Sequence, residues 1–159
     1  AYEISTRDWS SDVCSSDLVI SQATTDPTEL PAVLIEAFTA EPNRGNGAAV
    51  VLLNSPASSA WMQAMAGSLR QSETAFLLPW QGQWLLRWFT PTCEVPLCGH
   101  ATLAAVLALG HWRLLAEGEV VGFHTRSGPL PSQCQQAPSI GLAGQGAIEI
   151  PARSEEHTV

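Results

Sequence analysis

The sequence lacks a long apolar run and a secretion signal, and each absence excludes a class of protein. Its longest apolar run, residues 101–109, is about half the ~18 residues that a membrane-spanning helix requires. No basic segment followed by an apolar stretch and a small-residue cleavage site opens the chain, as a signal peptide would. We therefore expect a cytoplasmic protein with no membrane partner.

Basic residues are also scarce, with seven Lys and Arg against fifteen Asp and Glu. Between residues 32 and 152, five arginines face seven glutamates, so this span is nearly neutral and most of the acidity lies at the two ends. Nucleic-acid binding needs a basic patch, so no nucleic-acid partner is expected. A hydrophobic content of 45% over 159 residues is typical of one globular domain.

The four cysteines do not form a metal-binding pattern. Cys93, Cys98 and His100 lie close together in the sequence, but a structural zinc site needs a second pair of ligands at metal spacing, and none follows. We expect no metal and no cofactor. Without a secretion signal, free thiols are expected rather than disulfides.

The two ends differ in character from the middle. Residues 1–31 are rich in Ser, Thr and Asp and show no helical or strand period, which predicts disorder. Ser5–Leu18 (STRDWSSDVCSSDL) and Arg153–Thr158 (RSEEHT) also resemble peptides translated from sequencing-adapter DNA. We expect residues 1–31 and 153–159 to be non-native tails around a domain at 32–152. Ordinary disordered tails are the alternative.

Short apolar runs predict strands through the middle of the chain. The expected strands are residues 33–38, 48–53, 74–78, 83–89, 118–125 and 147–150. Residues 41–47 (EPNRGNG) read as a turn-rich loop. The Gly-, Pro- and Gln-rich stretch 127–146 is assigned at most a weak strand near 129–135.

Two helices are expected. One begins at a cap on Ser58 or Ser59 and runs to about Arg70, with Trp61, Met65 and Leu69 on one face. The other, from about residue 100 to 112, is rich in Ala and Leu and apolar almost all round, so it should be buried on every side. The fold class predicted is α+β: a curved, mostly antiparallel sheet wrapped around one buried central helix.

The start of the buried helix is the first candidate site. Free N–H groups and the helix dipole make a helix N-terminus attractive to anions, and Gly99 lets a ligand approach the backbone. Beside that positive end, Cys98 is expected to have a lowered pKa, and His100 can donate, accept or carry a proton. The alternative is that Cys98 is a buried core residue and that His100 is structural.

Two further segments are candidate sites. Glu73 stands where the first helix ends and an apolar strand begins, a position suited to a general acid or base, although a solvated glutamate is the alternative. Asn46 lies in the polar loop Arg44–Gly47, which could contact a substrate or could be an ordinary surface loop.

Taken in order, the motifs resemble the first half of phenazine-biosynthesis-like (PhzF-like) proteins. The segments are RGNGAAVVLL, SETAF, FTPTCEVPLCGHAT, FHTRSGPL and IEIPA. The resemblance implies a diaminopimelate-epimerase-like fold of two similar domains with the active site between them. The second domain is not expected within these 159 residues. The family usually has proline where Gly47 stands, which implies a looser turn here.

The resemblance also implies roles for individual residues. Glu73 would be the proton-shuttling acid and base, and Cys98 matches the position of an acid–base cysteine in related epimerases. Asn46, Gly99, His100 and Ala101 would contact the substrate. The expected activity is a cofactor-independent isomerase or epimerase that acts on a small carboxylate-bearing metabolite as a homodimer, with this fragment alone inactive. A non-catalytic small-molecule-binding protein of the same fold is the alternative.

Overall fold

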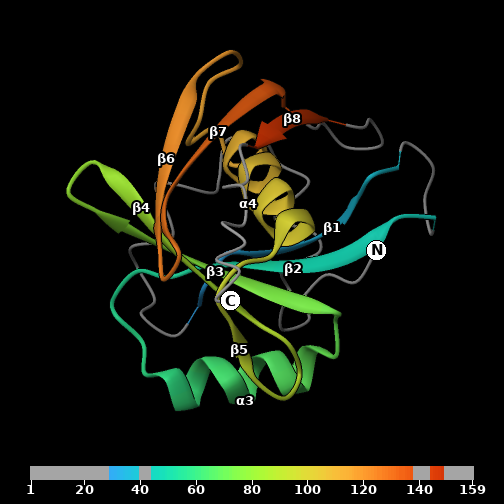
Figure 1. Ribbon diagram of the computed structural model, residues 1–159, viewed down its shortest axis with the longest axis vertical. Helices are drawn as coiled ribbons and strands as arrows, with labels where there is room; N and C mark the ends of the chain where they lie inside the picture. The colour runs from blue at the N-terminus through green and yellow to red at the C-terminus, as the bar shows by residue number, and fades with distance from the viewer. Residues whose placement is uncertain (1–28, 40–43, 138–143, 149–159) are drawn as a thin grey trace, which may run out of the picture.

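The computed structural model describes residues 29–39, 44–137 and 144–148. Apart from residues 29–31, the predicted tails at 1–31 and 153–159 lie outside the described residues. An eight-stranded sheet curls around one helix, and a second helix packs on the outside (Figure 1). The elements are β1 (Ala32–Ala37), β2 (Asn46–Leu52), α3 (Ser59–Leu69), β3 (Glu73–Trp80), β4 (Gln83–Phe89), β5 (Glu94–Val95), α4 (Gly99–His111), β6 (Val120–Thr125), β7 (Gly128–Gln136) and β8 (Gln145–Ile148).

The sheet is mixed, with mostly antiparallel neighbours. Its strand order is β1-β2-β3-β4-β6-β7-β8, and β5 pairs with β4. Two pairs are parallel, β2 with β3 and β4 with β6. The connection from β2 through α3 to β3 returns the chain to the same edge of the sheet, so β2 and β3 both begin there. This shared edge positions the candidate site.

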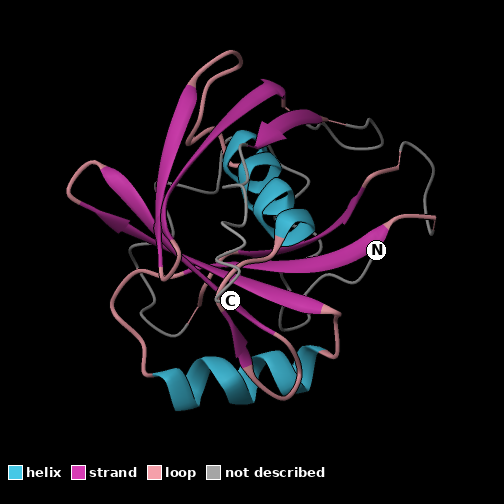
Figure 2. Cartoon of the chain, in the orientation of Figure 1, coloured by secondary structure: helices cyan, strands magenta, loops and turns pink. Residues whose placement is uncertain are grey.

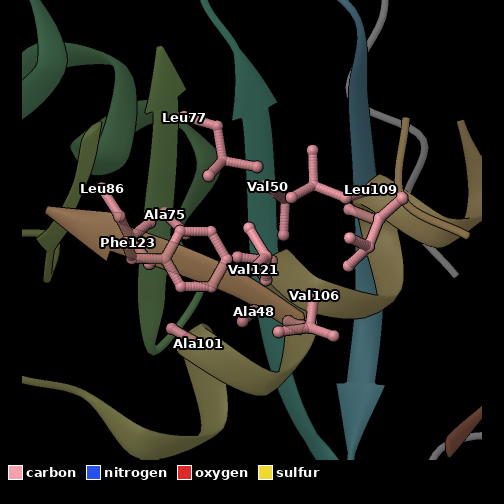
Figure 3. Packing of buried hydrophobic residues seen from close by; sticks show 14 of the residues in the cluster. Ala48, Val50, Ala75, Leu77, Leu86, Ala101, Val106, Leu109, Val121 and Phe123 are labelled. Carbon is pink, nitrogen blue, oxygen red and sulfur yellow. The ribbon is translucent and has the colours of Figure 1, made fainter. Parts of the chain in front are cut away.

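The central strands are buried on both faces. Alternate residues of β2 join two apolar clusters, since Ala48 and Val50 pack with α4 whereas Val51 packs with α3. β3 repeats the pattern, with Leu77 in the first cluster and Phe76 in the second. Figure 3 shows the cluster around α4. Strands covered on both sides read as near-continuous apolar runs, which explains why AAVVLL and TAFLL show no alternation.

Helix α4 confirms the prediction of a buried central helix. Nine of its thirteen residues are buried, and strands lie around it (Figure 2). Small side chains let the sheet approach closely: Ala101, Ala104, Ala105 and Ala108 are fully buried. Among the residues described, no helix is both long and apolar enough to cross a membrane.

Helix α3 begins as predicted, and its predicted face contacts the core: Met65 and Leu69 are partly buried against it, and Trp61 lies edge-on to Phe76. Ser58 is its N-cap, and its hydroxyl accepts a hydrogen bond from the backbone N–H of Trp61. The buried residues are Met62 and Ala66, one position along from the predicted Trp61 and Met65. Trp61 is 37% exposed. A small alanine at the contact lets the helix lie close to the sheet, where a tryptophan would hold it away.

Other element boundaries also differ from the predictions. The predicted loop 41–47 is wrong at its end, because Asn46 and Gly47 already belong to β2 and pair with β1. Gly47 therefore lies at a paired strand position, not in a loosened turn. β6 begins at Val120, two residues later than predicted.

The C-terminal strands are longer or shifted relative to the predictions. β7 is a full nine-residue strand where only a weak one was expected. β8 covers Gln145–Ile148, whereas the prediction was 147–150; residues 149 and 150 lie outside the described residues. The short strand β5 was not predicted.

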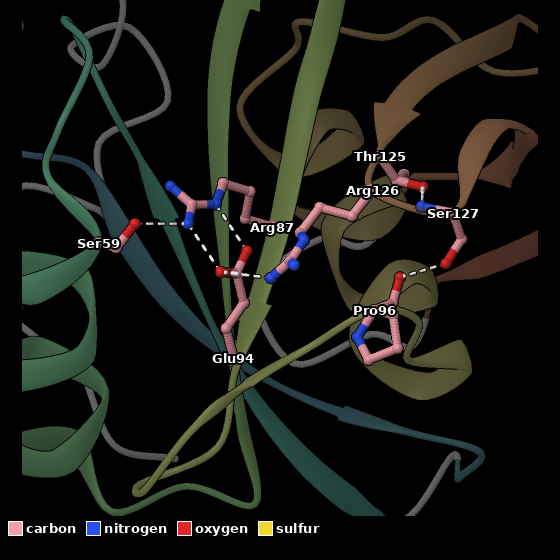
Figure 4. A network of polar contacts seen from close by, with 7 residues as sticks. All are labelled: Ser59, Arg87, Glu94, Pro96, Thr125, Arg126 and Ser127. Atoms are coloured by element: carbon pink, nitrogen blue, oxygen red, sulfur yellow. Dashed lines mark hydrogen bonds and ion pairs between the residues drawn. The ribbon is translucent and has the colours of Figure 1, made fainter.

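An ion-pair network ties β4, β5 and the β6–β7 turn together (Figure 4). The Arg87 guanidinium donates to both carboxylate oxygens of Glu94, from Nε at 2.7 Å and Nη2 at 2.8 Å, and Arg126 Nη1 donates to Glu94 Oε2 at 3.0 Å. Ser59 Oγ accepts from Arg87 Nη2 at 2.8 Å, which links α3 to the network. The hydrogen bonds from Arg87 hold the pKa of Glu94 below its ordinary value.

We expect this network to stabilise the fold in a pH-dependent way. Because folding lowers the pKa of Glu94, the contribution is complete above the ordinary carboxyl range and is lost as the pH falls below about 4. Urea unfolding should therefore show Glu94→Gln to be less stable than the wild type at pH 7, with the gap narrowing at pH 3. A gap that is the same at both pH values would contradict the ion-pair account.

Candidate active site

The starts of β2, β3 and α4 bring the candidate residues together. In the parallel β2–β3 pair, Ala48 lies opposite Glu73, so Asn46 and Glu73 both stand near the beginning of their strands. His100 in the first turn of α4 reaches the same place. Three segments that are far apart in the sequence therefore supply one polar cluster at the edge of an apolar core.

His100 is the centre of this cluster. Its Nε2 lies 2.9 Å from Glu73 Oε2, and its Nδ1 lies 3.3 Å from Cys98 Sγ. The side chains of His100 and Glu73 are 11% and 20% exposed, so both are largely enclosed and still reachable by a small ligand. The three residues predicted to carry chemistry are in contact.

Ser72 connects this cluster to β2. Its hydroxyl oxygen lies 3.2 Å from His100 Nε2, 3.1 Å from Asn46 Oδ1 and 2.8 Å from the carbonyl oxygen of Gly47. The hydroxyl has one proton to donate to the β2 oxygens and can accept from an imidazole N–H. Sequence reasoning assigned Ser72 no role, and its place directly before Glu73 was the one available signal.

Helix α4 begins at Gly99, directly after Cys98. Cys98 is the N-cap, but its side chain makes no capping hydrogen bond. The Thr102 hydroxyl donates a hydrogen bond to the Cys98 carbonyl oxygen at 2.6 Å, which stabilises this first turn. Ala101 is fully buried, backbone included, and its N–H points at the Cys98 sulfur. Gly99 is partly exposed, so it is the position in this turn where a ligand could approach the backbone.

The predicted thiolate at Cys98 is wrong. The pKa of the Cys98 thiol is raised to about 11, mainly by burial and to a smaller degree by the nearby Glu73 carboxylate. The backbone N–H groups of Ala101 and His100 favour the thiolate, which is the helix effect that the prediction relied on, but burial outweighs them. Cys98 is therefore a neutral thiol near neutral pH.

The cluster does not have the geometry of a three-ligand metal site as it stands. Glu73, Cys98 and His100 each offer a ligand atom, and these atoms lie within 4.8 Å of one another. Cys98 lies against Nδ1 of the imidazole, however, and Glu73 lies against Nε2. These nitrogens face different edges of the ring, so one ion could not bind all three side chains without rearrangement. The contacts are those of a hydrogen-bonded chain.

Gly45 holds the neighbouring segment in place. A Cβ at this position would lie 2.5 Å from Thr39 Cγ2, 2.6 Å from the Ala37 carbonyl oxygen and 2.9 Å from Glu36 Cβ. These distances are too short for any side chain. The end of β1 can therefore pack closely beside Asn46 because residue 45 is glycine.

Comparison with known proteins places this chain in a described family. Residues 35–155 match the family described as phenazine biosynthesis-like protein, PhzC–PhzF. An uncharacterized isomerase of Halalkalibacterium halodurans is 44% identical over 100 residues, which cover 63% of this chain and 38% of the relative.

Two Pseudomonas aeruginosa proteins extend the comparison. An uncharacterized isomerase is 41% identical over 129 residues, covering 80% of this chain and 46% of the relative. The solved structure of a predicted epimerase superposes with a TM-score of 0.64 at 32% identity, covering 70% of this chain and 40% of that one. The chain thus spans less than half the length of these relatives.

Proposed function

The chain belongs to the family of phenazine biosynthesis-like proteins, and on that premise we propose that it carries the acid–base side of an isomerase or epimerase active site. The reaction moves a proton within a small carboxylate-bearing metabolite and uses no cofactor. Relatives named as an isomerase and an epimerase support the reaction class. Since the chain spans less than half their length, the activity is proposed for a protein of full family length.

The contact between Glu73 and His100 carries this proposal. Glu73 at the start of β3 lies against His100 in the first turn of the buried helix α4, and both side chains are largely enclosed. The pair provides a proton acceptor next to a hydrogen-bond donor. Glu73 would take a proton from a carbon of the substrate and return it at another position or face. Because Glu73 would be part of the binding site itself, the reaction would need no base from solution.

The start of α4 would hold the substrate carboxylate. The backbone N–H of Gly99 and the Nε2–H of His100, which lies 2.9 Å from Glu73 Oε2, would both be shared with the substrate carboxylate. Donors aimed at a carboxylate also stabilise the negative charge that develops when the adjacent C–H bond is broken. Asn46, linked to His100 through Ser72, would bound the pocket on the β2 side.

We expect small carboxylic acids to bind at this helix start. In an NMR titration with succinate, malate and a set of amino acids, the backbone amides of residues 99–101 should shift most, because helix N-terminal N–H groups favour anions. His100→Ala should weaken binding roughly 10-fold, the loss typical of one hydrogen bond to a charged group.

His124→Ala on β6 is the matched control, because His124 contacts Gln83 and Trp80 rather than the cluster. It should leave the dissociation constant unchanged. Binding that shifts amides elsewhere in the chain, or an unchanged affinity in His100→Ala, would count against the site.

A further inference from the structure

Three side chains form a continuous chain of contacts from Cys98 to Glu73. Cys98 Sγ lies 3.3 Å from His100 Nδ1, and His100 Nε2 lies 2.9 Å from Glu73 Oε2. Each nitrogen of the imidazole thus has its own partner on its own edge of the ring. Ser72 Oγ is a second neighbour of Nε2, at 3.2 Å.

The chemistry of the two ends decides where the protons lie. An ionised carboxylate only accepts hydrogen bonds, so the contact with Glu73 is favourable when Nε2 carries a proton. A neutral imidazole has one N–H, which leaves Nδ1 as an acceptor that needs a donor. Within the described part of the chain, the side chain in contact with Nδ1 is that of Cys98, which is 9% exposed and a neutral thiol, as its raised pKa indicates.

The geometry points to Cys98 as a positioning residue: its S–H donates to His100 Nδ1 and fixes the Nε2–H tautomer, which then donates to Glu73. Cys98 does not itself take a proton from the substrate. Its effect on the reaction comes through the orientation of His100 and hence of the Glu73 carboxylate, and this effect rests on the proposed function. The direction of the two hydrogen bonds is independent of the proposed function.

The S–H stretching band tests the first hydrogen bond without any substrate. This vibration absorbs in an infrared window nearly free of other protein bands, and it moves to lower frequency when the S–H group donates. In the 159-residue chain near pH 7, the difference spectrum between wild type and Cys98→Ala should show a Cys98 band at lower frequency than that of the exposed Cys93, assigned with Cys93→Ala. His100→Ala should move the Cys98 band up.

Nitrogen-15 NMR of the His100 ring tests the second hydrogen bond. Near neutral pH the wild type should show an unprotonated Nδ1 and a protonated Nε2. Cys98→Ser should keep this state, because a serine hydroxyl can accept from the helix amides and still donate its own proton.

Three results would overturn the inference. They are the absence of a Cys98 S–H band near pH 7, which would mean a thiolate; a band whose frequency does not respond to His100→Ala; and a protonated Nδ1 in the wild type. If Cys98→Ala does not fold, the wild-type and His100→Ala spectra still decide the question. Because no substrate is involved, failure here leaves the proposed isomerase activity to be judged separately.

Discussion

Glu73→Gln is expected to reduce turnover by on the order of 10²–10⁴-fold, the range typical of removing a general acid or base. Glutamine has nearly the same shape as glutamate, and its carbonyl oxygen can still accept a hydrogen bond from His100. It cannot take a proton from carbon. Substrate affinity should therefore change little, and the loss should fall on kcat rather than on KM.

The assay uses the longest product of the gene that carries this sequence, with small carboxylic acids that bind the chain. Glu117→Gln is the matched control. Glu117 lies beyond the far end of α4, where its Oε1 accepts from the backbone N–H of Ala137, and the substitution should leave the rate unchanged. An unchanged kcat in Glu73→Gln would show that Glu73 is not the acid or base of the reaction.

Phe123→Ala is expected to lower the free energy of unfolding by about 3–5 kcal/mol, the range for truncating a buried phenylalanine. Phe123 on β6 is fully buried and packs in the cluster around α4, near Val121 and Leu86 (Figure 3). The substitution leaves a cavity between the curled sheet and the helix whose first turn forms the candidate site.

Urea unfolding of the 159-residue chain measures this effect. Val120→Ala, on the same strand but 64% exposed, is the control and should change stability by less than about 0.5 kcal/mol, as is usual for surface positions. Equal effects of the two substitutions would show that the sheet does not enclose α4 as described.

The main features of the fold could be predicted because the buried helix and the buried strands are apolar along their whole length. The all-round apolar character of residues 100–112 predicted the central helix α4. The continuous apolar runs of β2 and β3 predicted strands, although not that α3 and α4 cover opposite faces. The predicted face of α3 contacts the core, but the full burial of Met62 and Ala66 could not be predicted, because it depends on how closely that helix approaches the sheet.

Strand β7 shows why other elements were missed. Pro129 and Pro131 weaken a strand prediction because proline lacks the N–H of a ladder hydrogen bond. In the structure, both prolines nevertheless lie at paired positions, Pro129 opposite His124 and Pro131 opposite Gly122 of β6. Within the described residues, β8 pairs with β7 over Ser132–Gln136, beyond the two prolines.

The residues of the candidate site could be predicted from the sequence, but the protonation state of Cys98 could not. The motifs around Glu73 and His100 indicated both residues, and the structure places them in contact. The pKa of Cys98 was predicted with the wrong sign, because sequence shows the helix start but not the burial that outweighs it. Ser72 was overlooked because its contacts reach β2 and α4, which only the folded chain brings near.

Incorporation of deuterium from the solvent tests most directly whether Glu73 transfers a proton to and from a bound carboxylic acid. The longest gene product is incubated in D₂O with a carboxylic acid that binds at α4, without added cofactor, and the C–H signals are followed by NMR. Deuterium is expected to enter at a carbon next to or conjugated with the carboxylate, and Glu73→Gln is expected to abolish the incorporation. Binding without any deuterium entering the ligand would contradict proton transfer and favour a non-catalytic binding protein.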